Sequence, residues 1–127
     1  QTKSNKRIPT WSLRPGLIIG CKVTIRGKKA EELLKRLFVA KDNRLKKSCF
    51  DNAGNLSFGI EEYISIQGVE YDADIGIIGL QANVTFQRPG FRIRRRRLNQ
   101  RSIPKKHIIT QEEAIQHVIE KYEVKVR

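Results

Sequence analysis

One amphipathic segment sets the first condition that a fold of this chain must meet. Residues 28–40, KKAEELLKRLFVA, place apolar side chains at positions i, i+3, i+4, i+7 and i+8, which form one stripe along an α-helix. The stripe consists of Ala30, Leu33, Leu34, Leu37 and Phe38. Glu31 and Glu32 precede Lys35 and Arg36 by four residues, a spacing that stabilises helices. The segment therefore predicts a helix whose apolar stripe packs against a core.

A second helix is predicted near the C-terminus. Thr110 and Glu113 have the spacing of a capping box, which marks the start of a helix. The apolar residues that follow recur at helical spacing: Ala114, Ile115, Val118, Ile119 and Tyr122. This helix is therefore also expected to pack one face against the core.

Three segments have the pattern of β-strands. Residues 17–26, LIIGCKVTIR, carry apolar side chains at odd positions, so one face of this strand is predicted to enter the core. Residues 50–66 begin with turn residues and run into a second strand, and a third strand is expected over residues 79–88. This order predicts a single α+β domain over residues 1–127, with helices on one face of a mostly antiparallel sheet.

Positive charge is concentrated in two segments. The chain has 26 Lys and Arg residues against 13 Asp and Glu, a formal net charge of +13. Residues 1–29 contain eight basic residues and no acidic one, and residues 88–106 contain nine basic residues and no acidic one. The field of such segments attracts polyanions, with nucleic acid the first candidate and an anionic membrane the second.

The second basic segment contains a run of arginines, FRIRRRRLNQR, at residues 91–101. It lies between the third strand and the last helix, so we expect an inserted loop over residues 88–107 rather than a tail. Guanidinium groups bind phosphate oxygens in pairs and stack on bases, which suits RNA. The alternative is a solvated loop with no partner. The candidate contacts are Arg92, Arg94, Arg95, Arg96, Arg97, Arg101, Lys105 and Lys106.

The first basic segment begins with a predicted hairpin loop, residues 3–16. Its aromatic side chain, Trp11, is flanked by cations at Lys6, Arg7 and Arg14. Cations beside an aromatic ring suit single-stranded or irregular RNA, although the ring could instead pack against its own loop.

The even positions of the first predicted strand add another basic element. Lys22, Thr24 and Arg26 share one face, whose alternative role is an ordinary solvent-facing surface. RNA is favoured over DNA because neither predicted helix has the character of a recognition helix.

Acidic and histidine residues supply the rival hypotheses. The acidic candidates for a metal-dependent nuclease are Glu61, Glu62, Asp72 and Asp74. No motif connects them, and Asp72 and Asp74 stand where turns commonly place aspartate. His107 and His117 have no cysteine at ligand spacing, so a zinc site is not expected. We expect no enzyme activity, no metal and no cofactor.

Cysteines and hydropathy restrict the remaining classes. Cys21 and Cys49 have no CxxC spacing and are expected to be buried thiols in a reducing compartment. No stretch approaches the roughly 18 apolar residues of a membrane-spanning helix, and no signal-peptide pattern is present. No membrane partner is expected.

Several colinear motifs resemble one ribosomal family. They are IGCKVTIRG at 19–27, FDNAGNLSFGIEEYI at 50–64, YDADIGIIGL at 71–80, RPGF at 88–91 and SIPKKH at 102–107. They resemble the large-subunit L-five family, which binds 5S rRNA, in its archaeal and eukaryotic branch. The resemblance implies an RNA-recognition-like α+β fold in the central protuberance of the cytoplasmic ribosome. It also implies contacts with 5S rRNA, large-subunit rRNA, P-site tRNA and neighbouring ribosomal proteins, without a cofactor.

The resemblance further implies roles for individual residues. The family's KVT element matches Lys22 to Thr24, with Thr24 the expected direct contact to 5S rRNA and Arg26 nearby. Tyr71 and Asp72 match another element of that interface. The loop expected to face tRNA contributes Asn5, Lys6, Arg7, Trp11 and Arg14.

The start of the sequence supports one more expectation. The family has a further strand and helix upstream, and this chain opens with Gln1 and contains no methionine. The domain is therefore expected to be N-terminally incomplete. A non-ribosomal RNA chaperone or RNA-processing factor is the alternative function.

Overall fold

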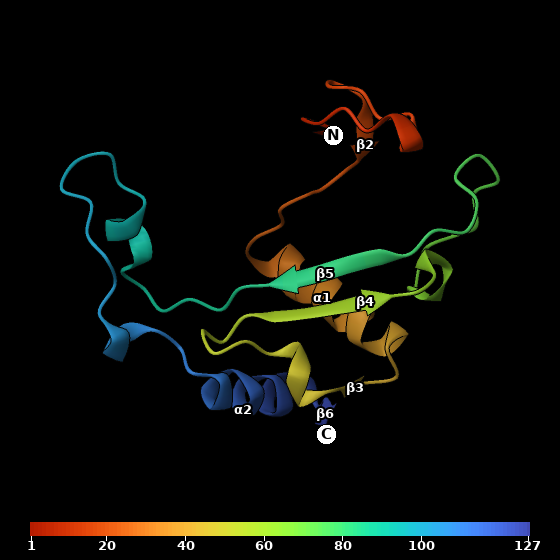
Figure 1. Ribbon diagram of the computed structural model, residues 1–127. Coiled ribbons are helices and arrows are strands. Elements are labelled where there is room, and N and C mark those ends of the chain that lie inside the picture. The colour runs from red at the N-terminus through yellow and green to blue at the C-terminus, as the bar shows by residue number, and fades with distance from the viewer. The chain divides into compact units, whose positions relative to one another are not determined.

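The computed structural model describes residues 1–127, which form two compact units, Gln1–Glu31 and Glu32–Arg127. The boundary between the units falls within the first helix. The helices are α1 (Lys28–Ala40) and α2 (Gln111–Tyr122), and the strands are β1 (Thr2–Lys3), β2 (Ile18–Gly20), β3 (Arg44–Leu45), β4 (Leu56–Ile60), β5 (Leu80–Val84) and β6 (Lys125–Val126) (Figure 1). Neither helix is long and apolar enough to cross a membrane.

The first unit is a small antiparallel hairpin in which β1 pairs with β2. The prediction of a ten-residue strand over 17–26 is wrong, because β2 ends at Gly20 and residues 21–26 pair with no other strand. An extended segment needs a neighbour to satisfy its backbone hydrogen bonds and to cover its apolar face. The odd-numbered face is therefore open, and Val23 is 81% exposed.

The cysteine prediction is wrong for one of the two residues. Cys21 lies in the unpaired segment and is exposed, because no core covers that face. Cys49 is half-buried beside the core of the second unit. Both cysteines are free thiols.

The second unit is built on the antiparallel pair β4–β5. Leu56 lies opposite Val84 and Ile60 lies opposite Leu80. Side chains alternate along β4, so Leu56, Phe58 and Ile60 are buried on one face. The other face is polar, and Ser57 Oγ donates a hydrogen bond to Asn83 Oδ1 at 2.7 Å.

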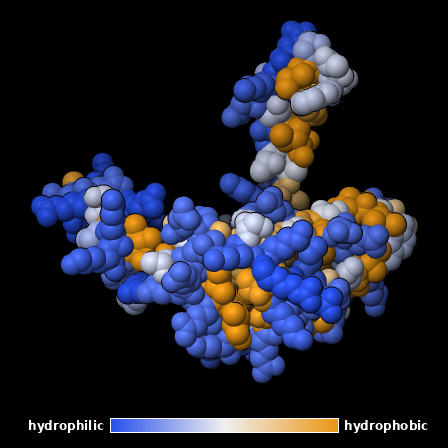
Figure 2. Space-filling view, turned by 60° about the horizontal axis from the view of Figure 1, so that its bottom comes forward, coloured by the Kyte–Doolittle hydropathy of each residue, from blue (hydrophilic) through white to orange (hydrophobic).

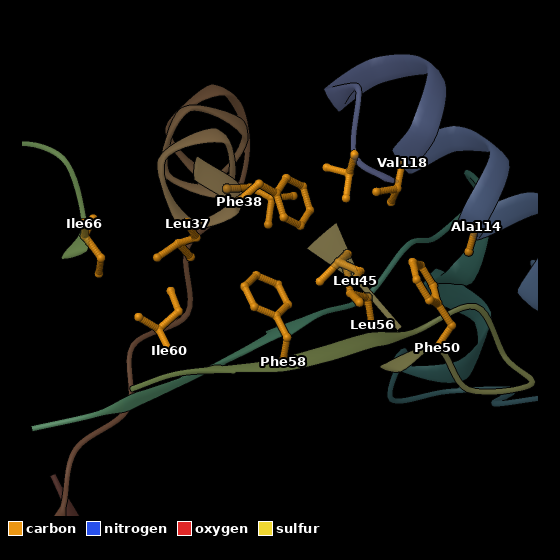
Figure 3. Close-up of a cluster of buried hydrophobic side chains, with 12 residues drawn as sticks. Leu37, Phe38, Leu45, Phe50, Leu56, Phe58, Ile60, Ile66, Ala114 and Val118 are labelled. Atoms are coloured by element: carbon orange, nitrogen blue, oxygen red, sulfur yellow. The ribbon is translucent and has the colours of Figure 1, made fainter. Parts of the chain in front are cut away.

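Both helices cover the apolar face of this strand pair (Figure 3). The ring of Phe38 stacks on Phe58 with 5.5 Å between ring centroids, and it meets Tyr122 edge-on at 5.3 Å. The buried core consists of Leu34, Leu37, Phe38, Leu45, Phe50, Leu56, Phe58, Ile60, Ile66, Ala114, Val118 and Val124.

The two predicted helices are confirmed. α1 covers the predicted residues, and Leu34, Leu37 and Phe38 of its stripe are buried. At the start of α2, the Thr110 hydroxyl accepts a hydrogen bond from the Glu113 N–H at 3.4 Å. The Glu113 carboxylate accepts one from the Thr110 N–H at 3.2 Å. The predicted capping box is therefore present.

We expect Thr110→Ala to destabilise the second unit by about 1 kcal/mol, because the first turn of α2 loses its capping acceptor. Urea unfolding followed by circular dichroism measures this change. Thr110→Ser is the matched control, since it retains the hydroxyl. Equal losses of stability in the two variants would contradict this role of the cap.

The turn before β4 was also predicted correctly. The Asp51 carboxylate accepts hydrogen bonds from the Ala53 N–H at 2.9 Å and the Asn55 N–H at 2.7 Å. Gly54 supplies the positive φ of 70° that the turn requires. The Asn55 side-chain amide, followed by the backbone N–H groups, lowers the pKa of Asp51 below its ordinary value.

The α+β class is confirmed, but the expected single, mostly antiparallel sheet is not formed. The strands make three separate two-stranded sheets: β1–β2, β4–β5 and the parallel pair β3–β6. β3 and β6 have two residues each, too few for the alternation that identifies a strand in sequence. Their parallel pairing joins segments about eighty residues apart, as in the register of Arg44 with Lys125.

Candidate nucleic-acid interface

The hairpin loop of the first unit is ordered by its own backbone. Ile8 and Leu13 exchange hydrogen bonds of 3.0 and 3.1 Å, which close a small turn at Pro9–Trp11. Ser12 completes this turn with a φ of 52°. The Trp11 side chain is 71% exposed, so the ring does not pack into the loop.

The base of this loop is also closed. Ser4 is buried, and its hydroxyl donates a hydrogen bond to the Lys6 carbonyl at 2.9 Å. Leu17 N–H bonds the Arg14 carbonyl at 3.1 Å across a Pro15–Gly16 turn. The loop thus brings together the predicted tRNA-facing residues, all exposed: Asn5, Lys6, Arg7, Trp11 and Arg14. Their role stays a prediction.

The segment after β2 does not form the predicted basic strand face. Lys22, Thr24 and Arg26 are exposed, but residues 21–26 have no regular structure. Whether these residues contact RNA stays a prediction based on the family resemblance.

The arginine run belongs to a segment of the second unit that we call the arginine lobe, residues 88–107. It contains short 3-10 turns at Phe91–Arg94 and Lys105–His107. Figure 2 shows hydrophilic residues crowded at its left edge, where this part of the chain projects. The eight predicted cations are all exposed: Arg92, Arg94, Arg95, Arg96, Arg97, Arg101, Lys105 and Lys106. No acidic side chain pairs with any of them.

Backbone and side-chain hydrogen bonds give the lobe an internal structure. The N–H groups of Arg95 and Arg96 both bond the Arg92 carbonyl at 2.9 Å, and Arg101 N–H bonds the Ile93 carbonyl at 3.2 Å. The Arg96 guanidinium donates two hydrogen bonds to the Asn99 carbonyl, from Nε at 2.9 Å and Nη2 at 2.7 Å. Arg96 therefore braces the lobe, while the other guanidinium groups are available to a partner.

Two side-chain contacts lie where the lobe leaves and rejoins the folded unit. Arg88 Nη2 forms an ion pair with Glu113 Oε1 at 2.7 Å. His107 Nε2 lies 2.7 Å from the Pro89 carbonyl oxygen. The Thr110 N–H, followed by the Arg88 side chain, lowers the pKa of Glu113 below its ordinary value. One carboxylate thus serves both the α2 cap and the lobe.

This shared carboxylate predicts an acid-sensitive contact. An unfolded glutamate titrates near pH ~4.3, and the pKa of folded Glu113 lies lower. Its stabilising effect is therefore full above that pH and is lost as pH falls through the folded value. We expect an NMR titration of the Glu113 carboxyl to have its midpoint below ~4.3, with Arg88→Ala moving the midpoint upward. An unchanged midpoint in that variant would contradict the ion pair.

Tyr71 and Asp72 lie in the connection between β4 and β5. Tyr71 is exposed, and the Asp72 N–H donates to the Tyr63 hydroxyl at 2.9 Å. No lysine or arginine occurs between Lys47 and Arg88, so contact with RNA here would rely on the ring and on hydrogen bonds. The role of both residues stays a prediction.

The structure gives the predicted acidic candidates a local role. The Asp72 carboxylate accepts a hydrogen bond from Asp74 N–H at 3.0 Å, which places both residues in a turn. No three His, Cys, Asp or Glu side chains gather as a metal-binding group.

Sequence reasoning missed the contacts at the base of the lobe. His107 was considered only as a zinc ligand with His117, but the His107 ring lies against Phe91 and the His117 ring against Phe86. Arg88 was not singled out. The SIPKKH motif contains His107, although nothing in its sequence identifies the acceptor.

Comparisons with known proteins agree on one family. The profile of the C-terminal part of the ribosomal uL5 family matches residues 18–117. The chain is 43% identical over 126 residues to large ribosomal subunit protein uL5 of Methanosphaera stadtmanae, covering 99% of this chain and 75% of that protein. It is 44% identical to uL5 of Nanoarchaeum equitans, with the same coverage. It is 49% identical over 116 residues to uL5 of Nitrosopumilus maritimus, covering 91% of this chain and 67% of that protein.

Proposed function

The chain belongs to the ribosomal uL5 family, and from this premise we propose that it is a structural constituent of the large ribosomal subunit in the cytoplasm. The proposed role is to bind 5S rRNA in the central protuberance and to contact P-site tRNA. It is a binding role, with no catalytic turnover and no cofactor.

One observation carries the RNA-binding part of this proposal. The arginine lobe holds eight exposed cations with no acidic partner, on a segment that contains no acidic residue. Uncompensated cations this close together repel one another, so a polyanion that neutralises them stabilises the arrangement. Arginine suits this role because its fork binds phosphate oxygens in pairs.

The strength of such binding depends on salt. If the lobe and the first unit together neutralise roughly 6 to 10 phosphates, the logarithm of affinity falls with the logarithm of salt concentration at a slope of roughly −5 to −9. The affinity for folded rRNA at physiological salt would then rest mainly on the release of counterions.

The family premise extends to the remaining elements. We assign an RNA-recognition-like fold to the second unit, supported by two helices on one face of β4–β5 and a polar opposite face. Lys22, Thr24, Arg26, Tyr71 and Asp72 are proposed to contact 5S rRNA. The exposed hairpin loop around Trp11 is proposed to face tRNA. Neighbouring proteins of the central protuberance are the proposed protein partners.

Purification of the tagged chain from cells tests this function. We expect 5S rRNA to co-purify with it, and the chain to sediment with large subunits in a high-salt gradient. A chain that leaves the subunits in high salt and carries no 5S rRNA would instead support a free RNA chaperone or processing factor.

A further inference from the structure

We propose that the arginine lobe is held in shape before RNA binds by a latch at its base, in which His107 is the positioning residue. The order of the free lobe follows from the contacts of this chain alone. The effect on RNA affinity rests on the function proposed above.

The His107 side chain reaches across the base of the lobe. His107 Nε2 lies 2.7 Å from the Pro89 carbonyl, so its N–H donates a hydrogen bond to a residue eighteen positions earlier. Its ring lies 5.7 Å from the Phe91 ring at an interplanar angle of 35°. Gly90, between these two contacts, has a φ of 103°, and a Cβ built there would lie 3.4 Å from Nε2. The backbone thus passes closely under the imidazole.

The ion pair of Arg88 with Glu113 adds a second tie at the same place. Arg88 immediately precedes Pro89, and Glu113 lies in the first turn of α2, so the start of the lobe is fixed to the helix that follows it. His107 then fixes the end of the lobe to its start. The two ties close residues 88–107 into a loop with a defined base.

Inside this closed base, the arginines are ordered by the contacts of Arg96 with Asn99 and of the backbone at Arg92. A free segment of this length would lose conformational entropy when RNA orders it, which weakens binding. The latch removes part of that cost before binding occurs. It does not alter the number of phosphates that the arginines reach.

This reasoning predicts two separate effects of breaking the latch. In the free protein, His107→Ala should raise the rate of trypsin cleavage at Arg94–Arg97 by roughly 3- to 10-fold, the equilibrium effect of losing one hydrogen bond. Cleavage after Arg36 in α1 should stay unchanged, which distinguishes local opening from unfolding. With 5S rRNA, affinity should fall by a similar factor while the salt slope stays the same.

Three further variants give the contacts their controls. His107→Gln keeps an N–H donor at the end of the side chain and should restore most of the protection, whereas His107→Phe keeps only a ring and should not. Lys106→Ala should leave cleavage at Arg94–Arg97 unchanged. If Lys106 contacts phosphate, its removal should reduce the salt slope by about 0.9.

The outcomes separate the latch from the proposed function. Unchanged cleavage at Arg94–Arg97 in His107→Ala would overturn the latch, whatever RNA does. Faster cleavage in a protein that does not bind 5S rRNA would support the latch and refute the proposed function. A salt slope that drops in His107→Ala as it does in Lys106→Ala would mean that His107 itself contacts phosphate, and would refute a positioning role.

Discussion

Replacing Arg94, Arg95, Arg96 and Arg97 together by alanine should weaken binding to 5S rRNA roughly 100-fold at physiological salt and flatten the salt dependence by about 3 to 4 units of slope. Each phosphate contact that is lost removes about 0.9 units, so four lost contacts predict about 3.6 and three predict about 2.7. The lower value applies if Arg96 stays on the Asn99 carbonyl and touches no phosphate. Filter binding at several salt concentrations measures both quantities.

A charge-matched variant provides the control. Arg44, Lys46, Lys47 and Lys125 are exposed and lie outside both basic segments, and their replacement by alanine removes the same net charge. This variant should retain most of the affinity and of the slope. Equal losses in the two variants would mean that total charge, rather than the arginine lobe, governs binding. No loss in the lobe variant would remove the arginine run from the 5S rRNA interface.

The largest expected effect on stability is that of Phe38→Ala. Phe38 is 1% exposed, stacks on Phe58 and meets Tyr122 edge-on, so it joins α1 to β4 and to α2. Truncation of a buried aromatic residue costs about 3–5 kcal/mol. Domains of this size are stable by about 5–15 kcal/mol, so the variant should be close to unfolded at 37 °C.

The neighbouring residue provides a control for Phe38→Ala. Val39 lies in the same helix but is 43% exposed, and Val39→Ala should change the free energy of unfolding by less than about 0.5 kcal/mol. Urea unfolding of both variants checks the pair. A Phe38→Ala variant that loses less than about 1 kcal/mol would contradict the packing described for the core.

The sequence predicted the elements whose signals are local. The stripe of α1 recurs within thirteen residues, and the Thr110–Glu113 cap lies within four, so both could be identified without knowledge of the fold. The strand over 17–26 also has a strong local pattern, but a strand forms only where another one pairs with it. That partner is a non-local property, and residues 21–26 have none.

The candidate site divides in the same way. The segregation of cations into residues 1–29 and 88–106 is visible in the sequence, because charge density requires no folding. The ties at the base of the lobe were not visible. Arg88 and Glu113 are twenty-five positions apart, and His107 bonds a backbone carbonyl, whose position has no signature in the side-chain sequence.

The central claim is that the arginine lobe lies on the phosphates of folded rRNA. Ultraviolet cross-linking of purified large subunits that contain this chain, followed by mass spectrometry of RNA-linked peptides, tests the claim directly. We expect the linked peptides to come from residues 88–107 and the linked nucleotides to be ribosomal. Subunits in which the chain is incorporated but this segment yields no RNA-linked peptide, while other parts of the chain do, would contradict it.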